Sequence, residues 1–196
     1  MSEVADRYGR VADGFGARLS GVVPEQWDHP TSCTGWNVRD LVLHVITTHR
    51  RVVATLDGVE VPDIDPDDDL GARWADATAA VRTALADNDR ANHTVTGMFG
   101  EQSFESMVGR LLCADTLFHT WDLARATGQD ERLDEPAVGK ALEFLTPMDE
   151  AIRRPGGVRC EDRLAGRCRR PDPPAALRRP ADRLSGRRYL GARRNL

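Results

Sequence analysis

The sequence of 196 residues has no long hydrophobic run, and this absence excludes a membrane-spanning helix, which needs about 18 consecutive apolar residues. Its first residues, MSEVADRYGRVADGFG, are polar and acidic, so they lack the basic start and the apolar segment of a secretory signal peptide. We therefore expect a cytoplasmic protein with no membrane partner. The length is sufficient for one domain with a substantial core.

Cysteines are few and widely spaced. The four are Cys33, Cys113, Cys160 and Cys168, and no CxxC pair occurs among them. Disulfide-stabilised small proteins and zinc knuckles both need closely spaced cysteines, so the sequence favours neither class. We interpret the cysteines as reduced thiols, and we expect Cys33 and Cys113 to be small buried side chains.

Lysine is nearly absent as well, and the charges are unevenly distributed. Residues 1–152 carry 12 Arg and Lys140 against 27 acidic residues, a net charge of −14. Residues 153–196 carry 14 Arg against 4 acidic residues, a net charge of +10. We therefore divide the chain into a folded domain, 1–152, and an Arg/Pro-rich tail, 153–196.

The tail has almost no apolar periodicity and repeats Arg-Pro and Arg-Arg pairs, so it cannot build a core. Arg, Pro, Gly and Ala are also the residues that GC-rich DNA encodes when it is read out of frame, and we interpret 153–196 first as a frameshift product. The alternatives are a natural disordered tail and a basic arm for nucleic acid. Nucleic acid is not the partner that we expect.

Apolar residues recur at helical spacing over most of the first 152 positions. The pattern predicts helices over residues 2–20, 37–56, 70–87, 103–127 and 135–153. Asn37 and Asp40 form a helix-capping pair at the start of the second, and Gly128 is typical of the residue that ends a helix. Pro147 should kink or break the last one.

Between these helices the sequence predicts exposed connections, the most acidic being 57–69. The connection 88–102 leaves open a short strand at 93–96. No other strand pattern competes with the helical periodicity. We therefore predict an all-α fold in which the helices form a bundle, followed by an irregular tail.

The helix predicted over 103–127 carries polar residues on its apolar face. A projection at 100° per residue from Met107 places Asp115, His119 and Asp122 within the apolar stripe of that helix. Burying an ionised carboxylate without a partner costs roughly several kcal/mol. Such a residue should therefore be paired, protonated or bound to a metal. We expect all three side chains to point toward the core.

Asp115 and His119 are four residues apart, so both can reach a single cation from one face. The simpler alternatives are an intrahelical hydrogen bond between them or a core carboxylate held by an Arg of another helix. A metal would need a third ligand, for which the candidates are His29, His44, His49 and His93. Periodicity favours His49, which it places on the apolar stripe of its helix with His44 on the flank, but the pattern alone cannot choose between them.

Two motifs carry a resemblance to a known family. They are CTGWNVRDLVLHV (33–45) and LLCADTLFHTWDLARATG (111–128). Together they resemble the metal-binding domain of the mycothiol-dependent maleylpyruvate isomerase family, part of the DinB-like superfamily. The resemblance extends over roughly residues 3–152. It implies a DinB-like four-helix bundle with long connections.

The same resemblance implies a divalent metal, usually zinc, held by three side chains. One is a His eight residues after the Trp of a Gly-Trp pair, here His44 after Trp36. The other two are Asp115 and His119, with Asp where the isomerase has Glu, so the carboxylate is one methylene shorter. The resemblance therefore selects His44 over His49.

Three protein ligands leave at least one coordination position open, where a bound thiol or water would have a lowered pKa. In the isomerase family the thiol is mycothiol, which adds to an activated double bond, permits rotation and leaves. The resemblance thus implies a metal-dependent isomerase or transferase-like enzyme that uses mycothiol or another low-molecular-weight thiol, with a small-molecule thiol or electrophile as partner. The alternative is a non-enzymatic metal-binding bundle, such as a stress-response or binding module.

Four further residues near these motifs are candidates for supporting the ligands or lining a substrate groove. We expect Trp36 and Trp121 to be core or groove-lining aromatics. Asp122 and Arg125 could form an ion pair, or Asp122 could accept a hydrogen bond from a metal-binding His and so orient it. Cys113 stands two residues before Asp115 and thus on another face, which makes it a poor ligand.

Overall fold

A computed structural model describes residues 2–65, 68–97 and 100–148 of the chain. The predictions for the tail, 153–196, lie outside these described residues. The helices are α1 (Glu3–Ser20), α2 (Val38–Asp57), α3 (Leu70–Ala86), α4 (Asn88–Asn92), α5 (Phe104–Met107), α6 (Cys113–Thr127) and α7 (Glu135–Leu145). Short 3-10 turns occupy Pro24–Gln26 and Thr146–Met148, a π-helical turn occupies Val108–Leu112, and the strands are β1 (Thr94–Gly97) and β2 (Gly100–Ser103).

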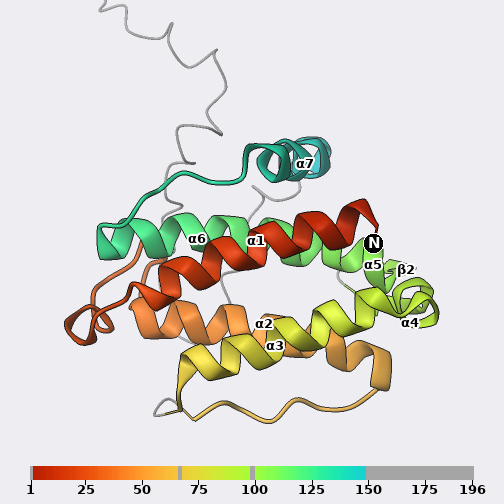
Figure 1. Cartoon of the computed structure of the whole chain (residues 1–196), viewed down its shortest axis with the longest axis horizontal. Coiled ribbons are helices and arrows are strands. Elements are labelled where there is room, and N and C mark those ends of the chain that lie inside the picture. The colour runs from red at the N-terminus through yellow and green to blue at the C-terminus, as the bar shows by residue number, and fades with distance from the viewer. Residues whose placement is uncertain (1, 66–67, 98–99, 149–196) are drawn as a thin grey trace, which may run out of the picture.

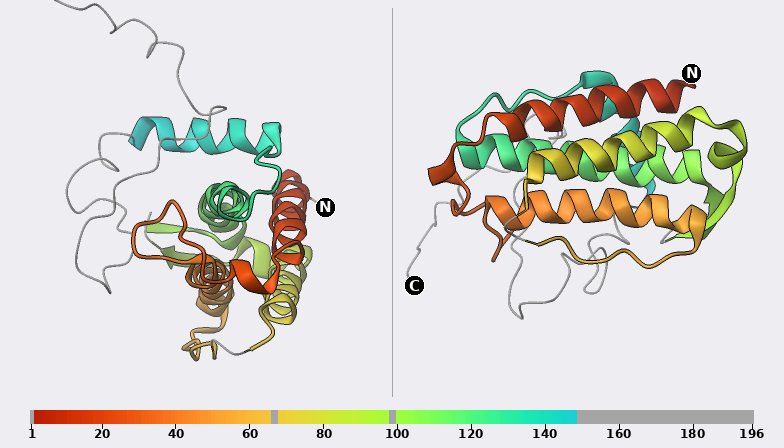
Figure 2. Two further views of the ribbon diagram at one scale, coloured as in Figure 1. Left: turned by 90° about the vertical axis from the view of Figure 1, so that its left-hand side faces the viewer. Right: turned by 60° about the horizontal axis from the view of Figure 1, so that its bottom comes forward.

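Four long helices, α1, α2, α3 and α6, form the bundle. Viewed along their axes they stand at the corners of a four-sided arrangement, with α1 against α3 and α6, and α2 against α3 and α6 (Figure 2). Helix α7 packs on α6 outside the bundle (Figure 1), and it runs across the direction of the four long helices (Figure 2). This confirms the predicted helical bundle. In the described part of the chain, no helix is both long enough and apolar enough to cross a membrane.

The core lies between the four helices and consists of the apolar stripes that the periodicity predicts. The largest fully buried apolar side chains include Tyr8, Phe15, Leu41, Ile46 and Leu123. Burying a side chain of this size stabilises the folded state by about 1.5–3 kcal/mol. A second apolar cluster, including Val11, Leu117 and Val138, attaches α7 to α1 and α6.

The predicted helix ends are confirmed. Asn37 and Asp40 cap α2 reciprocally: the Asn37 side chain accepts from the Asp40 amide at 2.9 Å, and the Asp40 carboxylate accepts from the Asn37 amide at 3.0 Å. Gly128 follows α6 with φ 69°, a left-handed conformation that favours glycine. Helix α7 ends at Leu145, and Pro147 lies in the 3-10 turn after it.

The helix predicted over 103–127 is not one α-helix, because the π turn Val108–Leu112 interrupts it. A π turn contains more residues than an α turn, so a projection at 100° per residue loses register across it. Gly109 in this turn lies close to α1, since a Cβ there would stand 2.9 Å from Nη2 of Arg7. Angles calculated from Met107 therefore do not apply unchanged to the residues that follow Leu112.

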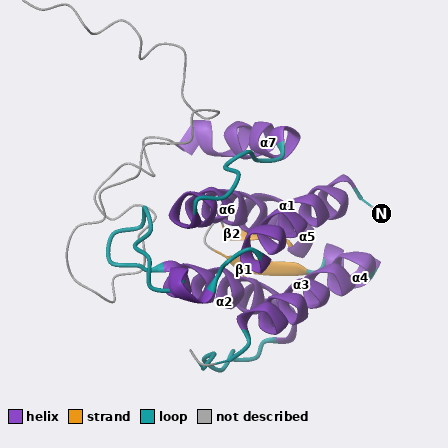
Figure 3. Cartoon of the chain, turned by 60° about the vertical axis from the view of Figure 1, so that its left-hand side comes forward, coloured by secondary structure: helices purple, strands orange, loops and turns teal. Residues whose placement is uncertain are grey.

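The other departure from an all-α fold is a small antiparallel sheet of β1 and β2, with Thr94 opposite Ser103 and Gly97 opposite Gly100 (Figure 3). The strand left open at 93–96 is thus present at Thr94–Gly97. The short helix α4 also lies within the connection predicted over 88–102. These elements close the end of the bundle between α3 and α5, and they contain few apolar residues for a pattern to detect.

Candidate metal centre

His44 of α2 meets Asp115 and His119 of α6 where these two helices pack together. Nε2 of His44 and Nε2 of His119 each lie 3.5 Å from the same carboxylate oxygen, Oδ1 of Asp115. One nitrogen or oxygen of each residue lies within 4.8 Å of the others. The side chains are 24%, 21% and 13% exposed for His44, Asp115 and His119, so the cluster is at the edge of the core and reaches solvent.

Strong electrostatic coupling holds this cluster together. Burial alone would lower the pKa of His119, but the carboxylates of Asp115 and Asp122 outweigh it and raise that pKa to about 10. Burial alone would raise the pKa of Asp115, but His119 and His44 hold it well below its usual range. Without a metal, both shifts favour the ionised form of Asp115 and the protonated form of His119.

The donor set fits a divalent cation. Ligands bound to a tetrahedral metal at 2.0–2.1 Å stand about 3.3–3.4 Å apart, and both His–Asp115 distances are close to that value. Oδ2 of Asp115 is buried and has no hydrogen-bond partner among the described residues, a costly condition that a cation would relieve if it bound both carboxylate oxygens. Two imidazoles and one carboxylate are also ordinary zinc ligands.

Asp122 supports His119 from the side opposite the cluster. Its Oδ2 lies 3.2 Å from Nδ1 of His119, and its Oδ1 accepts a 2.5 Å hydrogen bond from the Ser32 hydroxyl. The Cys33 thiol donates to Oδ2 at 3.8 Å. Asp122 is buried, as predicted. Of its two expected roles, an ion pair with Arg125 or a hydrogen bond with a metal-binding histidine, the structure shows the hydrogen bond with His119.

Arg125 makes a different ion pair from the one considered with Asp122. Its Nη1 lies 3.9 Å from the Glu131 carboxylate, and its guanidinium stacks over the Trp121 ring at 5.0 Å. Trp121 is buried at 7% exposure. Trp36, by contrast, stands over the cluster, with its ring 4.8 Å from that of His44 and 6.0 Å from that of His119.

The other histidines do not join the cluster. His49 is fully buried, its Nδ1 bonds to the carbonyl oxygen of Val45 at 2.8 Å, and its ring packs against Tyr8 and Trp74. Burial lowers its pKa to about 4. His29 and His93 are exposed. The position of His49 on the apolar stripe is confirmed, and His44 on the flank is the histidine that reaches Asp115 and His119.

Ser32 and Cys33 belong to the site but were not predicted as part of it. They precede α2 and contact Asp122 from a distance of about 90 residues along the chain. Cys33 begins the CTGW segment, but no spacing rule connects it with a residue of α6. Cys113, expected to be a poor ligand, is buried beside Arg7 on the α1 side of α6, and burial raises the pKa of its thiol.

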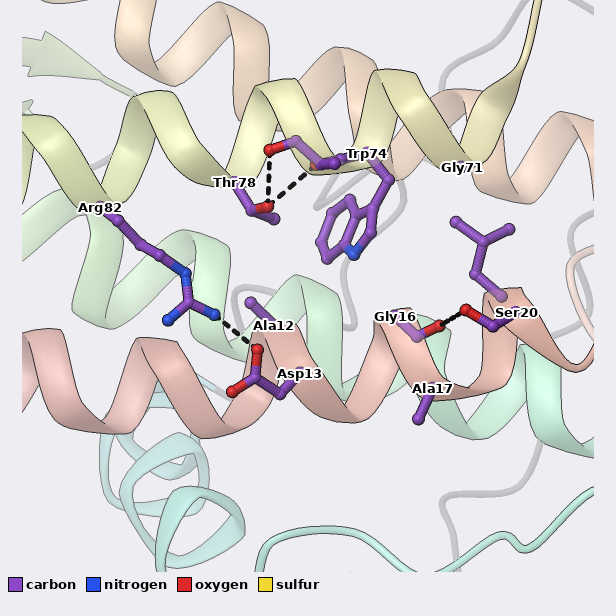
Figure 4. Close-up of a pocket in the computed structure, with 11 residues that line it drawn as sticks. Ala12, Asp13, Gly16, Ala17, Ser20, Gly71, Trp74, Thr78 and Arg82 are labelled. Atoms are coloured by element: carbon purple, nitrogen blue, oxygen red, sulfur yellow. Dashed lines mark hydrogen bonds and ion pairs between the residues drawn. The ribbon is translucent and has the colours of Figure 1, made fainter.

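A hollow of about 470 Å³ between α1 and α3 lies apart from this cluster (Figure 4). Trp74 packs there on Gly16, where a Cβ would stand 3.0 Å from Nε1 of the indole. Arg82 pairs with Asp13 at 2.6 Å, and Thr78 bonds to the carbonyl of Trp74 within its own helix. Arg82 and Asp13 thus pair with each other, and Thr78 and Ser20 bond to backbone carbonyls, so among the described residues this hollow presents no cluster of side chains comparable to the one around Asp115.

Comparison with known proteins agrees with the geometry. Residues 8–124 match the model of the mycothiol maleylpyruvate isomerase N-terminal domain family. The chain belongs to that family. The matched segment contains His44, Asp115 and His119, and it also contains Cys33 and Asp122. The resemblance based on the two motifs is therefore confirmed.

Relatives within this family include two uncharacterized proteins of Mycobacterium tuberculosis, from strains CDC 1551 and H37Rv. Each is 32% identical over 167 residues, which are 85% of this chain and 89% of the relative. No solved structure matches the chain. Membership of the family supports a mycothiol-related, metal-binding domain, and it does not by itself name a reaction.

Proposed function

We propose that this protein is a divalent-metal-binding enzyme that uses a low-molecular-weight thiol, in an isomerase or transferase-like reaction. His44, Asp115 and His119 would hold the ion, zinc being the first metal to test. The observation that carries the proposal is the convergence of two imidazole nitrogens on one carboxylate oxygen, at 3.5 Å each. Membership of the mycothiol maleylpyruvate isomerase N-terminal domain family supports it.

A divalent ion bound there would supply a Lewis-acid position at which a thiol or water has a lowered pKa. The protein would hold the ion with three ligands and leave a fourth position open, which is typical of catalytic rather than structural zinc sites. The partial exposure of all three side chains favours access of a small molecule to that position.

The remaining residues of the site would position the ligands. Asp122 would accept a hydrogen bond from Nδ1–H of His119, and the tautomer with its proton on Nδ1 leaves Nε2 with the lone pair that a metal needs. Ser32 donates to Asp122 and so limits its rotation. The Trp36 ring covers His44 and restricts solvent on one side of the cluster.

The small-molecule partner is part of the proposal. Mycothiol is the first thiol to test, because the family name refers to it. A cytoplasmic location, where such thiols are reduced, belongs to the same proposal. The Asp at position 115 would hold the ion with a shorter side chain than Glu does in the isomerase, so maleylpyruvate is only one of the electrophiles to test.

Metal analysis of the purified protein tests the proposal, followed by calorimetric titration with mycothiol. We expect one zinc per chain, thiol binding that depends on it, and loss of both in His119→Ala. His29→Ala changes an exposed histidine outside the cluster and should retain both. Zinc retained unchanged in His119→Ala would contradict the ligand set.

Thiol dependence separates the enzyme from the non-enzymatic alternative. A metal-binding bundle without catalysis predicts that chelation lowers the melting temperature while mycothiol neither binds nor reacts. Turnover of an electrophile such as maleylpyruvate that needs both zinc and thiol would exclude that alternative. Binding of zinc without any effect of thiol would contradict the enzymatic proposal and retain the metal site.

A further inference from the structure

We propose that this protein has a second metal position, for thiophilic cations, formed by Cys33, His119 and Asp122. A metal bound at this position prevents a metal from binding to His44, Asp115 and His119, because both positions use His119. The two positions lie on opposite edges of one imidazole ring. Nε2 lies beside Asp115, whereas Nδ1 lies beside Asp122, whose Oδ2 also contacts the Cys33 thiol. The inference goes beyond the proposed function, which assigns no metal ligand to Cys33 or Asp122.

The distances fit a common cation. Nδ1 of His119 lies 3.2 Å from Oδ2 of Asp122, and Sγ of Cys33 lies 3.8 Å from the same oxygen. Tetrahedral ligands at 2.0–2.3 Å from a metal stand about 3.3–3.8 Å apart, so a metal would need only small movements of these side chains. One donor atom of each residue lies within 4.8 Å of the other two.

Burial also separates the second position from the first. Cys33 is 6% exposed and Asp122 is 4% exposed, so this position is more enclosed than the cluster around His44. A buried carboxylate beside a thiol and an imidazole is a site where a cation replaces protons. Ser32 bonds to Oδ1 of Asp122, which leaves Oδ2 directed at Cys33 and His119.

The chemistry of His119 makes the two positions exclusive. A metal on Nε2 needs the ring proton on Nδ1, where Asp122 accepts it. A metal on Nδ1 needs that proton on Nε2, where Asp115 can accept it. A neutral imidazole has one lone pair for coordination, so one ring serves one metal at a time.

The ligand types then favour different metals at the two positions. Two imidazoles and a carboxylate are ordinary zinc ligands, whereas a thiolate binds zinc and binds a softer cation such as Cd²⁺ more strongly. Binding at the second position breaks the S–H bond of Cys33, forms a metal–sulfur bond and releases the proton to solvent, with no change of oxidation state. A thiophilic cation would thereby withdraw His119 from His44 and Asp115.

Titration with Cd²⁺ tests this second position in the full-length chain. Cys160 and Cys168 lie outside the described residues and could bind cadmium, so every protein tested carries Ser at both. We expect the ultraviolet thiolate-to-cadmium charge-transfer band to rise to one equivalent. Cys33→Ser should abolish the band, while the matched control Cys113→Ser, which changes the buried thiol beside Arg7, should retain it.

The zinc content of each variant shows whether it is folded, and it distinguishes failure of the second position from failure of the first. Cys33→Ser should still bind one zinc, which establishes that it is folded. His44→Ala should lose zinc but keep the cadmium band, and His119→Ala should lose both. A band that persists in Cys33→Ser, or that disappears in Cys113→Ser alone, would overturn the second position. A parent protein that binds no zinc would overturn the first position, and with it the exclusivity, but not the second position.

Competition tests the exclusivity. Cadmium added to zinc-loaded protein should release one zinc for each equivalent of charge-transfer band that forms, measured with a chromophoric chelator. Formation of the full band while all of the zinc stays bound would show two independent positions and overturn the exclusive use of His119.

Discussion

The two histidines of α2, His44 and His49, are only five residues apart, yet they lie in opposite environments. His44 is partly exposed and faces a carboxylate and a second imidazole. His49 is fully buried between Tyr8 and Trp74, and its Nε2 has no hydrogen-bond partner among the described residues. Both residues are histidines, so the direction in which each side chain leaves α2 decides which of them can act as a ligand.

This difference has an electrostatic basis. A carboxylate next to an imidazole stabilises a cation, whether a proton or a metal ion, at that position. An apolar enclosure destabilises the charged imidazolium, which is why the pKa of His49 is lowered to about 4. The region around His44 should therefore respond to metals, and the region around His49 should respond to acid.

The largest expected effect comes from substituting each of the two histidines separately and comparing the zinc affinities. His44→Ala should weaken zinc binding by more than about 100-fold, since removing a direct ligand costs more than removing a residue that only orients one. His49→Leu should leave the affinity nearly unchanged, because a side chain of similar size replaces it in the core. Zinc competition with a chromophoric chelator measures both. Equal losses in the two variants would contradict the distinction between them.

Acid should destabilise the protein through His49. Above about pH 6.5 the residue is neutral in both states and contributes nothing. Between pH 6.5 and about 4 the unfolded chain binds a proton that the folded protein cannot, so the free energy of unfolding should fall by up to about 3 kcal/mol. Urea unfolding at several pH values measures this decrease.

The control for this effect is again a histidine variant. His49→Leu should remove the corresponding part of the pH dependence, whereas His29→Gln, at an exposed position, should retain it. The same slope in wild type and His49→Leu between pH 6.5 and 4 would show that His49 is protonated in the folded state.

A third prediction concerns Asp122 of α6, which contacts His119, and the zinc affinity of its variants. Asp122→Ala should weaken zinc binding about 10–100-fold, because His119 loses the acceptor that orients it. Asp122→Asn retains an acceptor oxygen and should restore much of the affinity, and Asp13→Ala, at an exposed ion pair, should have no effect. Failure of Asn to improve on Ala would argue against a positioning role.

The smallest expected effect concerns α2 as a whole. Asn37→Ala removes the cap of the helix that carries both histidines and should lower the free energy of unfolding by about 1 kcal/mol. Zinc affinity of the folded protein should not change, because the positions of His44 and His49 relative to α6 stay the same. Thermal unfolding with and without zinc measures this, with Asn92→Ala as an exposed control. A large loss of affinity would show that the cap also fixes the metal site.

Much of the fold could be predicted because it depends on local patterns. The capping pair at Asn37 and the glycine at 128 mark helix ends through hydrogen bonds and backbone conformation within a few residues. The break near Pro147 follows from the chemistry of proline in the same way. Such signals act over one turn, so they can be detected without tertiary structure.

The π turn at 108–112 and the sheet of β1 and β2 could not be predicted in the same way. One extra residue in a helical turn leaves the composition unchanged, yet it rotates every later side chain relative to the stripe before it. Of the polar residues that follow this turn, Asp115 and His119 lie at the edge of the core and Asp122 is buried. The partner of Arg125, Glu131, likewise depended on where the chain turns after α6.

By itself, the sequence determined that this chain forms a helical bundle with a D-x-x-x-H pair on one helix, because periodicity and residue type are local properties. Periodicity left the histidine of α2 open and the family resemblance selected His44, which the tertiary structure brings to that pair; only the tertiary structure shows that Ser32 and Cys33 hold Asp122. The physical reason is that a ligand cluster requires donor atoms within a few ångströms of one another, and residues from separate helices reach that distance only when the helices pack.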